Sequence, residues 1–234
     1  MKRSFAVLTV PCSLTLVLAC GQAETTDSAA AVAGPPTELA DKVAYAMGAN
    51  LGRGLKQQNA DLDIAYILQG LEDGMGDGEL AMTQEEMQGA VQEFQQQMAR
   101  ETGDKNRAAG EEFLASNAER EEVTTLPSGL QYEVVQTGDG PKPEASDRVT
   151  VHYRGELIDK TVFDSSYDRG QPATFRLDQV IPGWTEGLQL MNVGSIHKLY
   201  IPADLAYGAN PPPGPIGPNA TLVFVVELIE IADA

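Results

Sequence analysis

The sequence predicts an α+β protein in which an all-α N-terminal domain precedes a β-sheet domain. From Thr37 to about residue 100, apolar residues recur at three- and four-residue spacings, as in amphipathic helices. From Val123 onward, apolar and polar residues alternate, as in half-buried strands. Nine of the 14 aromatic residues lie between Val123 and Ala234, so we expect the larger core there.

The first residues have the pattern of a bacterial lipoprotein signal peptide, assigned to residues 1–19. Lys2 and Arg3 precede an apolar run, residues 5–18, which is too short to span a bilayer comfortably. The run ends in Val17-Leu18-Ala19-Cys20, which resembles a lipobox, so Cys20 is expected to carry lipid after cleavage. The alternative is ordinary secretion with cleavage a few residues later. Residues 20–36 are small, polar and proline-ended, which predicts a flexible tether.

Cysteine count and charge exclude several classes of function. Cys12 is expected to be removed with the signal peptide, and Cys20 is the predicted site of lipid attachment. The folded part is therefore expected to have no thiol for disulfides, metal binding or catalysis. The net charge of −18 and the pI near 4.3 disfavour nucleic acid and anionic membranes as partners. Membrane contact is therefore expected only through the lipid.

Residues 37–122 are predicted to be helical. The first helix carries an apolar face from Leu39 to Leu51, and the second lies within 62–75. Thr83-Gln84-Glu85-Glu86 is a capping-box pattern that begins a third helix, expected to continue to about Glu122. That helix would be about 58 Å long. Gly103 and Gly110 are expected to kink or fray it.

The helical region is too small to bury much surface by itself. Domains of this size need a staple, a metal or a partner chain, and residues 37–122 contain no cysteine or histidine. The alternative is one ordinary core in which methionine fills the gaps. We favour a homodimer formed through residues 37–100.

The C-terminal half, residues 123–234, is predicted to contain five strands and one short helix. The strands are expected at 129–136, 148–157, 173–177, 195–201 and 221–231, and the helix at 183–191. Val149, Val151 and Tyr153 alternate with polar residues, as in a half-buried strand.

The usual catalytic constellations are absent from the sequence. No metal-ligand cluster and no phosphate-binding loop is visible, so we expect neither metal nor cofactor. His152 and His197 occupy alternating polar strand positions and are interpreted as surface residues. Aromatic and apolar residues gather around turns, which suits either a core or a pocket for a small apolar ligand such as a proline ring.

Five strings in the C-terminal half resemble FKBP-type peptidyl-prolyl cis-trans isomerases, in the order and approximate spacing of that family. They are VHYRG (151–155), FDSS (163–166), VIPGW (180–184), AYG (206–208) and NATLVF (219–224). The segment KVAYAMG (42–48) resembles the N-terminal dimerisation region of the bacterial Mip/FkpA group. GPIGPN (214–219) is similar to that group's pocket loop.

The resemblance implies an antiparallel sheet of about five strands wrapped around a short helix, with a pocket between them. Trp184 would form the pocket floor, and Ile181 N–H and the Tyr207 hydroxyl would bind substrate carbonyls. Asp164 would lie at the edge, oriented by Tyr153 or Arg169. The implied catalytic residues are Tyr153, Phe163, Asp164, Ile181, Trp184, Tyr207 and Phe224; the implied substrate-binding residues are Arg169, Phe175, Val180 and Ile216.

The function implied is acceleration of Xaa-Pro isomerisation during the folding of exported proteins, by a non-covalent mechanism, with chaperone activity beside it. The expected partners are proline-containing unfolded chains and macrolide inhibitors such as rapamycin. The expected location is the bacterial outer membrane or periplasm. The alternatives are a dimeric holdase chaperone and a surface interaction protein that uses the fold as a binding module.

Overall fold

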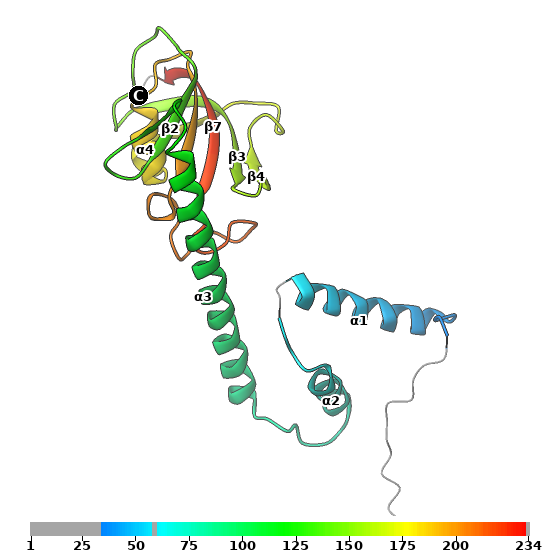
Figure 1. Ribbon diagram of the computed structural model, residues 1–234. Helices are drawn as coiled ribbons and strands as arrows, with labels where there is room; N and C mark the ends of the chain where they lie inside the picture. The colour runs from blue at the N-terminus through cyan, green and yellow to red at the C-terminus, as the bar shows by residue number, and fades with distance from the viewer. Residues whose placement is uncertain (1–33, 58–59, 233–234) are drawn as a thin grey trace, which may run out of the picture. The chain divides into compact units, whose positions relative to one another are not determined.

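The computed structural model describes residues 34–57 and 60–232 (Figure 1). The predictions of a signal peptide, of lipid on Cys20 and of most of the tether therefore concern residues outside the described ranges. The chain divides into two compact units between Gly54 and Leu55. The α+β class is confirmed: helices occupy the N-terminal part and an antiparallel sheet the C-terminal part.

Two short amphipathic helices come first in the chain. Helix α1 spans Leu39–Gln57 and α2 spans Ile64–Met75, where the Asp63 carboxylate accepts a hydrogen bond from the N–H of Ala65 at 2.8 Å. Neither helix has a buried residue, and the predicted apolar face of α1, including Leu39, Val43 and Met47, is exposed. These helices bury little surface in a single chain, as the sequence predicts.

Helix α3 spans Gln84–Asn117 and begins with the predicted capping box. The hydroxyl of Thr83 accepts from the N–H of Glu86 at 3.2 Å, and the Glu86 carboxylate accepts from the N–H of Thr83 at 2.8 Å. Contrary to prediction, α3 runs unbroken through Gly103 and Gly110. Both glycines are buried against the sheet domain, so contacts there compensate for their weak helix propensity.

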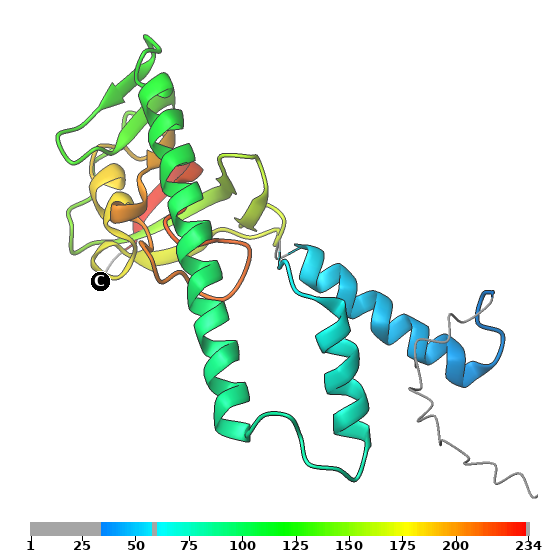
Figure 2. The ribbon, with the colours of Figure 1, turned by 60° about the horizontal axis from the view of Figure 1, so that its bottom comes forward.

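Helix α3 ends about one turn earlier than predicted, because its end is fixed to the sheet. The buried Asn117 amide donates to Gln131 Oε1 at 2.8 Å. Beyond the helix, Arg120 donates to the Tyr200 hydroxyl at 2.8 Å and to Glu133 at 2.9 Å. Figures 1 and 2 both show the C-terminal half of α3 alongside the sheet. Tertiary contacts thus decide where the helix stops.

Seven strands form one antiparallel sheet in the order β1-β2-β6-β7-β3-β4, with β5 pairing with β3 as well. The strands are β1 Val123–Thr125, β2 Gln131–Gln136, β3 Arg148–Leu157, β4 Val162–Ser165, β5 Ala173–Arg176, β6 Ile196–Ile201 and β7 Leu222–Ala232. Five were predicted close to these bounds, and the additional β1 and β4 are only three and four residues long. One edge of β3 pairs first with β5 (148–151) and then with β4 (154–156).

The core lies between the sheet and the short helix α4, Pro182–Leu188. Glycines allow close packing: a Cβ at Gly183 would overlap Ile201, and one at Gly187 would lie 2.8 Å from Leu199 Cδ1. Two single 3₁₀ turns, η1 Leu177–Gln179 and η2 Ala203–Leu205, flank α4 and β6 in sequence. The fully buried side chains include Leu130, Val149, Val151, Leu177, Leu188, Met191, Leu199, Ile201, Leu222 and Leu228.

The prediction that both histidines lie on the surface was wrong. His197 is 5% exposed, and its ring stacks on Tyr132 with centroids 5.7 Å apart. Because side chains alternate along a strand, His197 lies on the same face of β6 as Leu199 and Ile201, which are fully buried in the core. Burial lowers the pKa of His197, and Lys142 lowers it further. His152 is half-buried, with Nδ1 2.9 Å from the hydroxyl oxygen of Ser166.

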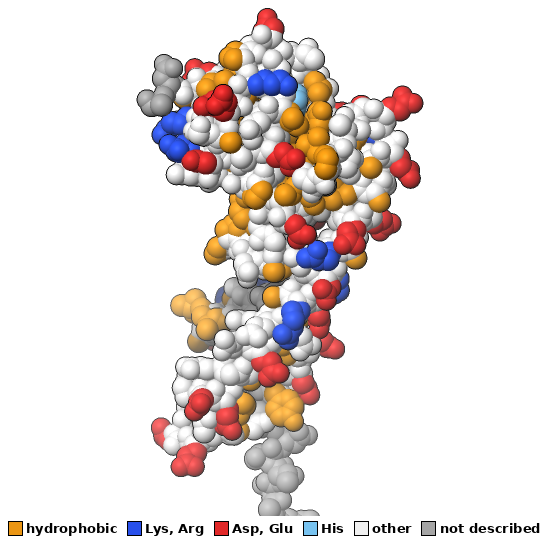
Figure 3. Space-filling view, turned by 90° about the vertical axis from the view of Figure 1, so that its left-hand side faces the viewer, with side chains coloured by type: hydrophobic (Ala, Val, Ile, Leu, Met, Phe, Trp, Pro, Cys, Tyr) orange, Lys and Arg blue, Asp and Glu red, His pale blue; other side chains and the backbone are white. Residues whose placement is uncertain are grey.

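The surface carries both signs of charge, and on the face shown in Figure 3 acidic and basic side chains are dispersed along the helical part rather than gathered in one patch. Within residues 34–57 and 60–232, no helix has the length and apolar character needed to cross a membrane. In the same ranges, no group of three or more histidine, cysteine or acidic side chains is arranged to hold a metal ion.

Candidate active site

A cavity of about 570 Å³ opens between the sheet and α4. Tyr153 of β3, Phe163 and Asp164 of β4, Phe175 of β5 and Phe224 of β7 approach it from the sheet. The cavity is also lined by Gln179, Val180, Ile181 and Trp184 around the start of α4, and by Tyr207 and residues 212–216. Elements far apart in sequence therefore meet at one hollow.

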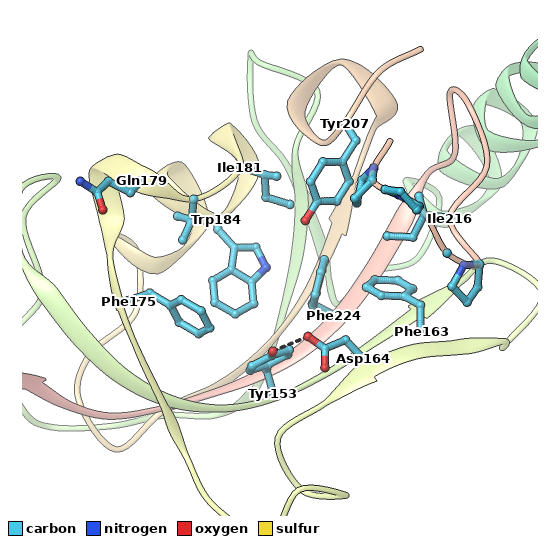
Figure 4. Close-up of a pocket in the computed structure, with 15 residues that line it drawn as sticks. Tyr153, Phe163, Asp164, Phe175, Gln179, Ile181, Trp184, Tyr207, Ile216 and Phe224 are labelled. Atoms are coloured by element: carbon cyan, nitrogen blue, oxygen red, sulfur yellow. Dashed lines mark hydrogen bonds between the residues drawn. The ribbon is translucent and has the colours of Figure 1, made fainter. Parts of the chain in front are cut away.

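Aromatic rings packed edge to face form the floor and walls (Figure 4). The Trp184 ring centroid lies 5.2 Å from those of Tyr153 and Phe224 and 5.4 Å from that of Phe175, with interplanar angles of 86°, 78° and 88°. Phe163 meets Phe224 at 5.5 Å and 83°. Edge-to-face pairs at these distances are favourable and hold one another's orientation. The rings therefore form a rigid apolar surface.

Gly155 makes this arrangement possible. It lies in β3, paired with Asp164 on one side and Phe224 on the other. A Cβ at this position would come within 2.6 Å of two ring carbons of Phe163 and 2.7 Å of one of Phe224. Only a residue without a side chain lets the two phenylalanine rings close over the strand.

The start of α4 places Trp184 and Ile181. Ile181 is the N-cap residue with extended backbone, and Pro182 follows at the first helical position, where its fixed φ suits the turn. The Ile181 carbonyl accepts hydrogen bonds from the N–H groups of Trp184 at 2.9 Å and Thr185 at 3.2 Å. The buried indole N–H of Trp184 has no hydrogen-bond partner among the described residues. The floor therefore carries one unpartnered donor among aromatic rings.

A single polar cluster, made of Tyr153, Asp164 and Arg169, lies at one edge of the cavity. The Tyr153 hydroxyl donates to Asp164 Oδ2, and Arg169 donates to Asp164 Oδ1. Arg169 also donates to the Tyr153 hydroxyl oxygen at 2.7 Å, with its guanidinium carbon 5.4 Å from the Tyr153 ring centroid. Both orienting groups expected for Asp164 therefore contact it.

The cluster shifts the pKa values of its members in opposite directions. Partial burial opposes ionisation of Asp164, but hydrogen bonds from Tyr153 and Arg169 and the charge of Arg169 together outweigh it, so the pKa of Asp164 is lowered. Burial and the hydrogen bond to Asp164 raise the pKa of Tyr153. At neutral pH, Asp164 is thus a carboxylate and Tyr153 a protonated donor.

Ten of the eleven residues that the sequence assigned to a pocket line this one cavity. They are Tyr153, Phe163, Asp164, Phe175, Val180, Ile181, Trp184, Tyr207, Ile216 and Phe224. Arg169 does not line the cavity, but it donates hydrogen bonds to Asp164 and to the Tyr153 hydroxyl oxygen. The resemblance placed the loop that contains Pro215 at the pocket, but the sequence reasoning did not name Gln179, Pro212 or Pro213 as pocket residues, and these also form part of the wall. The run Pro211-Pro212-Pro213 predicts a stiff loop, and the resemblance of the adjoining GPIGPN (214–219) predicts its place at the pocket.

Comparison with known proteins gives the same family in both halves. Residues 140–229 match the family model described as FKBP-type peptidyl-prolyl cis-trans isomerase, and residues 40–134 match the domain amino terminal to it. The outer membrane protein MIP of Legionella longbeachae is 45% identical over 92% of this chain and 95% of its own length. The FKBP-type peptidyl-prolyl cis-trans isomerase FkpA of Aeromonas hydrophila is 46% identical over 90% of this chain and 83% of its own.

A solved structure supports the same assignment. The crystal structure of FkpA from Escherichia coli matches with a TM-score of 0.64 at 40% identity, over 86% of this chain and all of that one. Both family models, relatives at this identity over most of their length and the shared fold agree. The chain therefore belongs to the FKBP-type peptidyl-prolyl cis-trans isomerases.

Proposed function

We propose that the aromatic cavity around Trp184 is where an Xaa-Pro bond is twisted, and that the chain serves the folding of exported proteins. The observation that carries this proposal is the set of edge-to-face rings that line an open cavity of about 570 Å³, with one polar cluster at its edge. A proline ring suits an apolar hollow of this kind.

The reaction needs no nucleophile. Amide resonance maintains a rotation barrier of about 18–20 kcal/mol. Resonance places charge on the amide oxygen, so a dry pocket disfavours the planar amide relative to the twisted one. A thousandfold acceleration requires only about 4 kcal/mol of differential binding. A desolvated cavity with a few positioned donors is adequate for that task.

Three polar groups are proposed to position the substrate. The Ile181 N–H, which makes no hydrogen bond to another described residue, and the Tyr207 hydroxyl at the open side would donate to carbonyls flanking the proline. Asp164, held by Tyr153 and Arg169, presents negative charge at the other edge. Trp184, Phe175 and Phe224 contact the ring, and Phe163, Val180 and Ile216 complete the walls.

The proposed cellular setting is the bacterial envelope. The lipobox-like Val17-Leu18-Ala19-Cys20 supports export with a lipid on Cys20, and one relative is named an outer membrane protein. The mass of the protein recovered from membranes of a bacterial host measures this directly. A subunit beginning at Cys20 with added lipid is expected; an unmodified subunit beginning after Cys20 would contradict the anchor.

The first test is the refolding of a protein whose slow phase is prolyl isomerisation, a step of tens of seconds unaided. The soluble form, residues 21–234, is expected to accelerate that phase at substoichiometric amounts. A macrolide such as rapamycin is expected to block the acceleration by filling the cavity. If the chain binds the unfolded protein without accelerating its slow phase, a holdase or binding module is the better account.

Exposed apolar side chains in the helices favour a dimer, with chaperone activity as an accompanying function. On α3, Met87, Val91 and neighbouring glutamines line a shallow groove, and the predicted apolar face of α1 is exposed as well. Pairing of residues 37–100 between two chains would cover such surfaces. Two pockets on a helical dimer would then hold one unfolded chain together.

We expect the soluble form to sediment as a dimer at micromolar concentration. Val91→Asp is expected to shift it to monomer, because a carboxylate would be buried in an apolar interface. Gln96→Glu is the control: it adds the same charge to the same helix about 140° of helical rotation from Val91. A wild-type monomer at that concentration, or equal effects of both changes, would contradict dimerisation through this stripe.

A further inference from the structure

The C-terminal half of α3 lies unusually close to the chain that leads into β7. Gly103 and Gly110 are buried and lie seven positions apart, about two helical turns, on one face of α3. A Cβ at Gly103 would be 3.0 Å from Asn219 Nδ2 and 3.3 Å from Pro218 Cβ. A Cβ at Gly110 would overlap the hydroxyl of Thr221. The two glycines therefore bring the helix backbone against residues 218–221.

Polar contacts between these glycines fix the approach. Asn106, half-buried on the same side of α3, donates from Nδ2 to the carbonyl of Pro218 at 2.8 Å. Its amide also packs on Gly217, where a Cβ would lie 2.7 Å from Nδ2. Arg107 donates to Asn219 Oδ1 at 3.3 Å. Asn106 is thus the residue of α3 that holds the backbone of this segment directly.

The segment held by α3 is the far end of a loop that forms one wall of the cavity. We name residues 211–219 the rim loop. Its residues 212–216, including Ile216, line the cavity, and its last residue, Asn219, donates from its N–H to the carbonyl of Gly208 at 2.7 Å. Asn219 has φ +53°, a conformation that needs support from its surroundings in a non-glycine residue. Gly208 follows Tyr207 directly, so Asn219 ties the rim loop to Tyr207.

We infer that α3 positions the rim of the cavity, and that Asn106 is a positioning residue for the isomerase reaction. The connection runs from Asn106 to Pro218, through Asn219 to Gly208, and so to Ile216 and Tyr207 on the two ends of the rim. Asn106 touches no substrate in this account. The inference rests on the proposed role of the cavity, and it assigns to α3 a function beyond joining two domains.

The test compares Asn106→Asp with Gln96→Glu in the soluble form, residues 21–234. Both exchange an amide for a carboxylate on α3, but Gln96 is exposed and lies about 15 Å along the helix from Asn106. In Asn106→Asp the carboxylate faces the Pro218 carbonyl and the donor is lost. We expect kcat/KM for Xaa-Pro peptides to fall about fivefold, mainly through KM, because the wall contacts ground and transition states alike. Gln96→Glu is expected to match the wild type.

A second readout is independent of activity. Trp184 is the only tryptophan of the chain and forms the floor of the cavity, so quenching of its fluorescence by acrylamide reports how open the rim is. Quenching is expected to increase in Asn106→Asp and not in Gln96→Glu. Asn106→Ala, which removes the donor without adding charge, provides a second variant if the aspartate impairs folding.

The outcomes separate this inference from the proposed function. Wild-type KM and wild-type quenching in a folded Asn106→Asp or Asn106→Ala protein would overturn the positioning role, as would equal changes in Gln96→Glu. If all forms are folded but inactive, the proposed role of the cavity fails. In that case the quenching of Trp184 still decides whether Asn106 holds the rim loop.

Discussion

Replacing Gly155 by alanine is expected to lower the free energy of unfolding of the sheet domain by about 2 kcal/mol, within the usual range for an overpacked site. Isomerase activity is expected to fall by at least about tenfold at a temperature where the variant remains folded. The added methyl carbon would lie 2.6 Å from Phe163 Cε2 and Cζ and 2.7 Å from Phe224 Cε1. Phe224 is already in edge-to-face contact with Trp184, so neither phenylalanine ring can move without deforming the cavity.

Urea unfolding followed by Trp184 fluorescence measures the stability of this domain specifically, because no other tryptophan contributes. The matched control is Gly89→Ala on α3, where a Cβ would meet nothing within 4 Å and alanine favours the helix. Its unfolding midpoint and activity should equal or slightly exceed those of the wild type. A Gly155→Ala protein with unchanged midpoint and activity would show that the two rings are not held as tightly as their packing indicates.

The same glycine illustrates what a sequence states directly and what it does not. The string VHYRG (151–155) was one of the five that indicated the family, and the alternation of Val149, Val151 and Tyr153 predicted the strand. The reason for Gly155 became visible only once β4 and β7 were placed on either side of it. On α3, Gly103 and Gly110 were interpreted as breaks for a similar reason. Helix propensity depends on the local sequence, whereas the burial of these two glycines depends on tertiary contacts with the sheet domain.

The errors in the sheet and the site have a common physical origin. Strands β1 and β4 span three and four residues, too few for an alternation pattern to be recognised. Burial of His197 depends on Tyr132 of a neighbouring strand rather than on its own segment. Gln179 in η1 and Pro212 and Pro213 in the rim loop carry no chemical signature of a site, and they line the cavity only because the tertiary fold brings them there. By contrast, several site residues were found because they stand in the family strings, namely Tyr153, Phe163, Asp164, Trp184, Tyr207 and Phe224.

Replacing Asp164 by alanine is expected to reduce kcat/KM about tenfold while leaving the sheet domain folded. Hydrogen bonds that involve a charged group contribute about 1.5–3 kcal/mol, and the lower part of that range applies because the Asp164 side chain is 42% exposed. About 1.4 kcal/mol lost in the transition state is a factor of ten in rate. The control is Asp178→Ala: the Asp178–Arg176 pair has side chains 43% exposed, and Asp178 does not line the cavity. A turnover unchanged in Asp164→Ala would remove the carboxylate from the reaction.

The pH dependence of this effect follows from the direction of the shifts. Because the folded-state pKa of Asp164 lies below the ordinary value of about 3.9, its ion pair is fully present above that value and is lost only as pH falls through the lowered pKa. Tyr153, whose pKa is raised, stays protonated throughout the neutral range. The ratio of wild-type to Asp164→Asn activity should therefore be constant between about pH 5 and pH 8. An inflection inside that window, present in the wild type and absent from Asp164→Asn, would mean that Asp164 titrates near neutrality. The Tyr153 and Arg169 hydrogen bonds would then be too weak to hold it as a carboxylate, and its role as fixed negative charge at the edge of the cavity would have to be abandoned.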